Sequence, residues 1–222
     1  MKTEISVDSV IFGFKDEQLK VLLIKRKEVP EKGKMALPGD FLDSKESLKT
    51  CAEKKLRLIT GLDNIFLKQI GAFGEVERYP LDRVVTVGYF ALINIFNNKI
   101  EAGYTAEKLE WCGVNDLPPL AFDHKEIINR AHSILKRKIR LEPIGFNLLP
   151  EKFSLTELQS VYEAVLNTQL NKRNFRTKLN QMKLLIDTGQ KQTNVAHKPA
   201  ILYRFDKKVY EQLTSKGFFF NL

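Results

Sequence analysis

Residues 37–62, LPGDFLDSKESLKTCAEKKLRLITGL, constrain the fold of this chain more than any other segment. A Leu-Pro-Gly turn leads into a stretch in which apolar residues recur at helical spacing (i, i+4, i+8 and i+11), namely Leu48, Ala52, Leu56 and Ile59. Gly61 follows at the position where a glycine commonly ends a helix. The segment therefore predicts a turn and then an amphipathic helix from Glu46 to Ile59.

Apolar and β-branched runs predict strands on both sides of this helix. Residues 6–14 and 19–26 form two such runs, separated by the polar turn 15–18. Residues 84–95, VVTVGYFALINI, are too apolar for a half-exposed strand and predict a central buried one. Residues 124–140 are predicted to be helical, and their basic end suits the helix dipole.

A different pattern begins after residues 142–150. In this segment proline, glycine and asparagine are closely spaced, which predicts a linker between domains. The segment is also apolar, so we expect it to pack against the protein. Ser154 and Glu157 have the spacing of a capping box, and the helix that follows has the apolar stripe Leu155, Leu158, Tyr162 and Val165. Asn171 is predicted to cap a second helix. The inward residues of that helix are Phe175, Leu179 and Met182.

Two short strands are predicted after the second helix, at residues 183–186 and 200–205, around the polar loop TGQKQTNVAHKP. Helix, helix and hairpin is the order of elements in a winged helix-turn-helix domain.

The composition is that of an ordinary soluble globular protein, with 43% hydrophobic and 28% charged residues among 222. No apolar run reaches the ~20 residues that a membrane helix requires, and the N-terminus lacks the layout of a signal peptide. Cys51 and Cys112 are too few for a disulfide framework or a zinc cluster. We therefore expect a cytoplasmic protein without a membrane partner.

The positive charge is concentrated toward the C-terminus. The formal net charge is +9, and residues 151–222 hold 12 Lys+Arg against 6 Asp+Glu. This basic segment favours a nucleic-acid-binding surface, although charge alone is equally consistent with a solvated face.

The opening segment resembles the Nudix box, G-x5-E-x7-R-E-U-x-E-E-x-G-U, in which U is a bulky aliphatic residue. The matching frame positions are Glu46, Leu56, Gly61 and Leu62. The opening glycine of the box falls on Asp40. The Arg-Glu and Glu-Glu pairs are replaced by Lys54-Lys55 and Leu58-Ile59.

These substitutions remove the metal-binding groups of the box. Glutamates three and four residues apart share one helix face, where they bind cations that neutralise a pyrophosphate and activate water. Protonated lysine does not ligate magnesium, and the side chains of Leu58 and Ile59 have no ligand atom. We therefore expect no metal, no cofactor, no catalytic residue and no hydrolase activity. Lys55 is consistent with a plain helix-surface residue, with a partner for Glu46, or with a side chain that holds an anionic or hydroxyl-rich ligand.

The whole chain resembles the bacterial Nudix-related transcriptional regulators, the NrtR-like group. The likeness is carried by GAFGEVERYPLDRVVTVGYFALI, LPPLAFDH, EPIGFNLLP, FSLTELQSVYEAVL and NKRNFRTKL, and it is closest to the arabinose-responsive AraR type. It implies an α+β protein with a Nudix-like α/β/α effector-binding domain (1–141), a linker (142–150) and a winged helix-turn-helix DNA-binding domain (151–222). Such proteins usually bind two half-sites, so we expect a homodimer.

The second helix of the C-terminal domain is the predicted reader of double-stranded operator DNA. Its expected outer face carries Arg173, Arg176, Thr177 and Asn180. Arginine can pair with guanine and asparagine with adenine through two hydrogen bonds. Lys172, Lys178 and Lys198 are better suited to phosphates, and Lys191 of the hairpin loop is a further candidate.

The cleft of the Nudix-like domain is the candidate effector site. The resemblance places residues 122–124 beside this cleft, although Asp123 is equally suited to capping the following helix. The candidates are Phe12, Arg26, Phe41, Glu75, Arg83, Asp123 and His124, with Phe73 and Arg78 as further members. Phenylalanines in strands are also consistent with plain core.

Two effectors arise from the resemblance, ADP-ribose and a pentose such as L-arabinose. A diphosphate usually needs a metal for neutralisation, whereas a sugar needs only hydrogen-bonding groups; we therefore expect the sugar. Two other function classes remain open. One is a divergent Nudix hydrolase that uses Glu75 and Glu77, and the other is an RNA-associated adaptor.

Overall fold

The computed structural model describes residues 3–193 and 198–222, which form two compact units. Residues 16–18 belong with residues 135–222 in the second unit, and the first unit holds the rest of the chain up to residue 134. The segment 142–150 lies within the second unit. The tip of the predicted polar loop, residues 194–197, lies outside the described residues.

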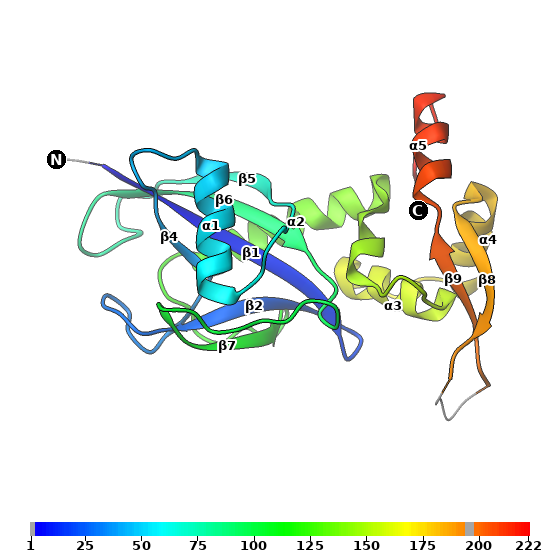
Figure 1. The fold of residues 1–222 in the computed structure, drawn as a ribbon, viewed down its shortest axis with the longest axis horizontal. Helices are drawn as coiled ribbons and strands as arrows, with labels where there is room; N and C mark the ends of the chain where they lie inside the picture. Colours follow the sequence, from blue (N-terminus) through cyan, green and yellow to red (C-terminus); the bar gives the residue numbers. More distant parts are fainter. Residues whose placement is uncertain (1–2, 194–197) are drawn as a thin grey trace. The chain divides into compact units, whose positions relative to one another are not determined.

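The first unit is built on a mixed seven-stranded sheet in the order β3-β2-β1-β6-β5, in which β4 also pairs with β1 and β7 with β2 (Figure 1). The strands are β1 (Glu4–Lys15), β2 (Gln18–Arg26), β3 (Met35–Ala36), β4 (Gly39–Phe41), β5 (Lys68–Phe73), β6 (Val84–Leu92) and β7 (Ala106–Gly113). Strand β6 pairs in parallel with β1 and antiparallel with β5. The apolar run that begins at Val84 is therefore central, as predicted.

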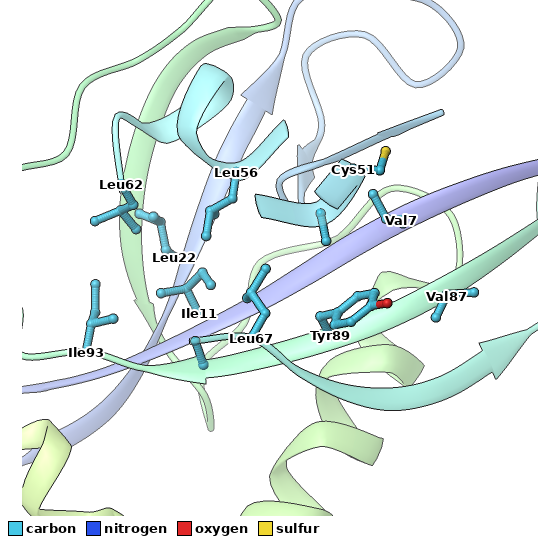
Figure 2. Close-up of a cluster of buried hydrophobic side chains, with 12 residues drawn as sticks. Val7, Ile11, Leu22, Cys51, Leu56, Leu62, Leu67, Val87, Tyr89 and Ile93 are labelled. Atoms are coloured by element: carbon cyan, nitrogen blue, oxygen red, sulfur yellow. The ribbon is translucent and has the colours of Figure 1, made fainter. Parts of the chain in front are cut away.

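Helix α1 (Leu48–Thr60) covers one face of this sheet. Leu56 and Ala52 of α1 are buried with Val7 and Ile11 of β1 and with Tyr89 of β6, and Figure 2 shows these elements around one apolar cluster. The amide N–H of Gly61 donates to the carbonyl of Arg57, and φ of this glycine is 74°. The predicted helix and its glycine cap are therefore confirmed, with the start at Leu48 because Ser47 caps the helix.

Helix α2 (His124–Leu141) covers the opposite face. Side chains alternate along a strand, so Gly88 of β6 faces away from the cluster that contains Val87 and Tyr89. A Cβ atom at Gly88 would lie 3.4 Å from Cγ2 of Ile127 in α2. The first unit is thus the α/β/α layer structure that the resemblance implied.

Among the described residues, the second unit contains the end of α2 from Leu135, a short 3-10 helix, three further α-helices and a hairpin. The elements after α2 are η1 (Pro143–Leu148), α3 (Leu155–Leu166), α4 (Lys172–Met182), β8 (Leu185–Lys191), β9 (Ile201–Phe205) and α5 (Lys207–Ser215). The capping box of Ser154 and Glu157 is formed, and the side chain of Asn171 caps α4. These elements confirm the predicted winged helix and the α+β class.

Aromatic side chains hold the second unit together. The ring of Phe146 in η1 stacks on Phe205 of β9 at 4.3 Å, and Tyr162 of α3 meets Phe175 of α4 edge to face at 5.5 Å. Phe153 exchanges two backbone hydrogen bonds with Tyr203, which adds a third short strand segment to the hairpin.

Several elements differ from the sequence prediction. The strand predicted from Lys183 is wrong at its start, because Lys183 adopts the left-handed conformation that ends α4, and β8 begins at Leu185. Strands β5 and β7 and helix α5 were not predicted. Among the described residues, none of the helices combines the length and the apolar character needed to cross a bilayer.

Candidate functional site

The first unit contains a cavity of about 190 Å³ beside the short strand β4. Its walls come from β1, the end of β2 and the residues after it, β4, residues 78–84 and the turn before α2. The charged lining residues are Asp8, Arg26, Lys27, Glu28, Asp40 and Arg78. Three cations and three carboxylates therefore line this cavity, and their formal charges cancel.

A buried ion pair adjoins the cavity, which Arg78 lines. Arg78 donates from Nε and Nη2 to the two carboxylate oxygens of Asp123, at 2.8 and 2.7 Å, and its side chain is 3% exposed. Nη2 also lies 3.8 Å from Oδ2 of Asp8, which accepts a hydrogen bond from Thr86 at 2.7 Å. One arginine therefore stands between two carboxylates from distant parts of the chain.

His124 adjoins this pair as a buried neutral base. Its Nδ1 accepts a hydrogen bond from the backbone N–H of Leu37 at 2.9 Å, so the ring proton belongs on Nε2, which lies 3.6 Å from Asp8. Burial lowers the pKa of His124 below its ordinary value, against the opposing pull of the Asp8 charge.

Gly39 allows β4 to approach β1 closely. The register pairs Gly39 with Asp8, and a Cβ atom at residue 39 would lie 2.1 Å from Oδ1 of that carboxylate. The glycine of the Leu-Pro-Gly lead-in is therefore required by the wall of the cavity.

Aromatic rings form the rim of the cavity. Tyr79 packs against Phe122 at 5.2 Å between ring centroids and against Phe41 at 6.0 Å. The guanidinium of Arg26 lies 5.0 Å from the centroid of Phe122, which is within range of a cation–π contact. Phe41 is 36% exposed, so the rim offers a ligand both flat apolar surface and positive charge.

Lys55 contacts the cavity wall through Asp40 and does not itself line the cavity. Its Nζ lies 2.9 Å from Oδ2 of Asp40, and the hydroxyl of Tyr104 donates to that oxygen at 2.8 Å. Glu46 is bound at 3.5 Å by Lys54, which also binds Asp43 at 2.8 Å. Of the alternatives that the sequence left open for Lys55, the pairing with Glu46 is wrong, since the partner of Lys55 is Asp40.

The residues of the degraded box do not fit a divalent cation. Lys55 provides an ammonium, the side chain of Leu58 is exposed and that of Ile59 is fully buried in an apolar cluster. Over the part of the chain that the structure describes, no three His, Cys, Asp or Glu side chains converge in a way that could hold a metal ion.

The structure brings together part of the predicted effector set. Arg26, Phe41 and His124 line the cavity, and Asp123 holds the lining residue Arg78. Phe122, which the resemblance placed beside the cleft, also lines the cavity. The sequence prediction did not single out Asp8 or Tyr79 as ligand-facing residues. A carboxylate at position 8 within an apolar strand was the one available signal for Asp8.

Four candidates do not line this cavity. Phe73 lies at the end of β5 and is absent from the lining. Phe12 is fully buried and packs against His132 at 6.2 Å, so it belongs to the core. Arg83 donates to the backbone carbonyls of Glu75 and Gly74 at 3.1 and 2.7 Å, and neither Arg83 nor Glu75 lines the cavity. The contacts of Arg83 with the backbone of the loop before β6 account for its position outside this cavity.

The exposed face of α4 is the second candidate site. Phe175 and Leu179 are buried, and Arg173, Thr177 and Asn180 are exposed on the opposite side. The four lysines assigned to DNA, Lys172, Lys178, Lys191 and Lys198, are also exposed.

Arg176 departs from the predicted outer face. It is half-buried, and its Nη2 lies 3.4 Å from Oγ1 of Thr156 at the start of α3. The reason is its position one residue after Phe175 and three before Leu179, beside the buried stripe. Arg176 therefore joins α4 to α3 in this structure.

Comparison with known proteins covers both units. A Nudix domain model matches residues 2–131, and a model described as the NrtR DNA-binding winged helix domain matches residues 145–205. The ADPR responsive transcriptional repressor NtrR of Acinetobacter baylyi is 36% identical over 93% of this chain and 83% of its own length.

Two solved structures from Shewanella oneidensis are similar. NrtR complexed with a 27mer DNA has a TM-score of 0.79 and 32% identity, covering 98% of this chain and 99% of its own. The NUDIX domain of NrtR complexed with ADP ribose has a TM-score of 0.57 and 32% identity, covering 61% of this chain and 90% of its own. These relatives do not support the assignment to the arabinose-responsive AraR type.

Proposed function

This chain belongs to the NrtR family, in which a Nudix domain precedes a winged helix domain, and on that premise we propose that it is a DNA-binding repressor that responds to ADP-ribose. The observation that carries the proposal is the 36% identity with an ADPR responsive repressor, which extends across both units. The DNA-binding unit would be the winged helix and the sensor the Nudix unit.

The geometry of α4 supports the DNA-binding part. The helix has a buried apolar stripe and an exposed side that presents Arg173, Thr177 and Asn180. Such residue types read base edges in the major groove, and the exposed lysines around them suit phosphates. Because winged helices usually bind paired half-sites, we propose that the protein acts as a homodimer.

The cavity supports ADP-ribose over a simple sugar. The lining cations Arg26 and Lys27 can approach a diphosphate, whereas Arg78 is already paired with Asp123. The rim rings Phe41 and Tyr79 offer flat surfaces to a base. A volume of about 190 Å³ is below the ~300–1,000 Å³ of typical ligand sites, so an elongated ligand would extend over this rim.

The expectation of L-arabinose rested on the premise that a diphosphate needs a metal. The structure weakens that premise, because the cavity wall carries the cations Arg26 and Lys27 and its carboxylate Asp40 is already paired with Lys55. The names of the relatives point to ADP-ribose, and the sugar is therefore not proposed.

A DNA-shift assay and a thermal melt, run side by side, test the proposal. ADP-ribose at about 100 times its dissociation constant should release a bound operator fragment and stabilise the protein by about 2.7 kcal/mol, whereas L-arabinose should do neither. The exposed rim residue gives a matched variant. Phe41→Ala should weaken ADP-ribose binding about three- to tenfold without changing the affinity for DNA in the absence of ligand.

The opposite result is equally clear. Either of two results would reject ADP-ribose as the effector. In the first, L-arabinose releases the DNA and ADP-ribose does not. In the second, the melt shows that ADP-ribose binds the protein, but the affinity for the operator does not change.

A further inference from the structure

The ammonium of Lys55 stands where the Nudix pattern has a metal-binding glutamate, and it faces a carboxylate. Asp40 accepts from three donors: Nζ of Lys55 at 2.9 Å, the hydroxyl of Tyr104 at 2.8 Å, and the N–H of Phe41 at 2.8 Å. The Lys55 side chain is 12% exposed, so this contact is sheltered from solvent.

Both partners are held in their charged forms. Burial alone would raise the pKa of Asp40, but the hydrogen bonds from Lys55 and Tyr104 bring it below the ordinary value. Burial alone would lower the pKa of Lys55, but Asp40 raises it above the ordinary value. The pair is therefore a stable ion pair near neutral pH.

The pair changes the charge that a ligand meets. Asp40 lines the cavity, whereas Lys55 lies behind it. A bare carboxylate at this place would repel a diphosphate, or would require a bound cation to bridge the two. With Lys55 in contact, the net charge at this part of the wall is zero.

We propose that Lys55, by neutralising Asp40, removes the need for the divalent cation of the Nudix site, so that a diphosphate ligand binds in this cavity without metal. The inference rests on the proposed function, because ADP-ribose is the diphosphate concerned. It adds that the sensor responds to its ligand independently of the magnesium concentration.

Titration calorimetry of the full chain with ADP-ribose, in excess EDTA and in excess MgCl₂, tests the inference. The unchanged protein should bind equally well in both buffers. Lys55→Glu places a second carboxylate beside Asp40, and it should weaken binding in EDTA by about tenfold or more, with recovery in MgCl₂. Lys55→Met leaves Asp40 without its cation. It should weaken the binding of ADP-ribose in EDTA, and MgCl₂ should restore this binding only in part.

Lys54→Gln is the matched control. Lys54 is the preceding residue on the same helix and also forms ion pairs, but with Asp43 and Glu46, neither of which lines the cavity. This variant should bind ADP-ribose like the unchanged protein in both buffers. The fluorescence of Trp111, the single tryptophan, verifies that the first unit of each variant is folded.

A second titration, with Mn²⁺ alone, separates this inference from the proposed function. Only Lys55→Glu should gain a Mn²⁺ site. A magnesium requirement in the unchanged protein, or a Lys55→Glu variant that binds ADP-ribose normally in EDTA, would overturn the inference. A different outcome is that the unchanged protein binds ADP-ribose in neither buffer, while Lys55→Glu alone binds Mn²⁺. In that case ADP-ribose is rejected as the effector, but the inference that Lys55 excludes a metal from this site is upheld.

Discussion

Arg78 and Asp123 are 45 residues apart in sequence, and their side chains meet through two parallel hydrogen bonds of 2.8 and 2.7 Å. The pair ties the loop before β6 to the turn before α2 and places a guanidinium in the cavity wall. Two carboxylates, those of Asp123 and Asp8, depend on this one buried cation.

Removal of that cation should be costly. We predict that Arg78→Met destabilises the first unit by about 3–5 kcal/mol, because Asp8 and Asp123 would be left buried without their partner. Urea unfolding followed by the fluorescence of Trp111 measures the effect in this unit. Addition of Asp123→Asn to Arg78→Met should restore part of the loss, which a purely steric effect of the methionine would not explain.

Lys108→Met supplies the control for this measurement. Lys108 forms an exposed ion pair with Glu110, and such pairs contribute little to stability. The urea midpoint of this variant should match that of the unchanged protein. If Arg78→Met and Lys108→Met lowered the free energy of unfolding by similar amounts, the burial of Arg78 would not be the cause of the destabilisation.

The pKa of His124 predicts how stability depends on pH. Burial lowers this pKa below the ordinary value near 6.5, so the unfolded chain binds the proton more readily than the folded one. The contribution of His124 is therefore fully present above about pH 6.5 and is lost as the pH falls through the lower folded-state pKa.

His124→Asn tests this dependence, because the asparagine oxygen can still accept the hydrogen bond from Leu37. We expect the unchanged protein to lose stability between neutral pH and about pH 5 more steeply than the variant. Melting temperatures across this range, with Trp111 as the probe, give the comparison. Parallel curves would indicate that His124 does not titrate across this transition.

Hydrolysis is the activity that the Nudix fold suggests, and we predict that it is absent. Lys55, Leu58 and Ile59 provide no carboxylate to a metal, and Ile59 is fully buried. Chromatographic detection of AMP from ADP-ribose with magnesium should show no release above the uncatalysed rate. Turnover of about one per second, within the usual range of enzymes, would contradict this.

The face of α4 predicts two kinds of DNA contact. Arg173→Ala should weaken binding to the cognate operator by about 1–3 kcal/mol and relax specificity at one base pair, because this exposed arginine is near the start of the helix. Lys191→Ala should weaken all sequences alike and reduce the salt dependence by about one unit of slope.

Arg176→Ala distinguishes a base contact from a structural role. Because Arg176 lies against Thr156 of α3, we expect its loss to reduce the stability of the second unit as well as the affinity for DNA. Hydrogen exchange of the α3 and α4 amides measures the stability, and a shift assay with cognate and random DNA measures the affinity. If the variant lost affinity for cognate DNA alone and its hydrogen exchange did not change, Arg176 would be a base contact and not a structural residue.

Local sequence determined most of the elements and the overall class. The apolar spacing of Leu48, Ala52 and Leu56 predicted α1, and Gly61 and Ser154 marked a helix end and a helix start that the structure contains. These signals are readable because a cap or an amphipathic stripe depends on residues a few positions apart. The degraded box likewise showed, from residue types alone, that the usual metal ligands are missing.

Tertiary structure alone decided which side chains meet. Nothing within a few residues of Arg78 indicates Asp123, and nothing near Lys55 distinguishes Asp40 from the nearer Glu46 as its partner. Phe12 and Phe41 look alike in sequence, yet one is core and the other a cavity rim. The physical reason is that strand order and register, set by the packing of the whole sheet, bring together residues whose separation along the chain carries no information about their contact.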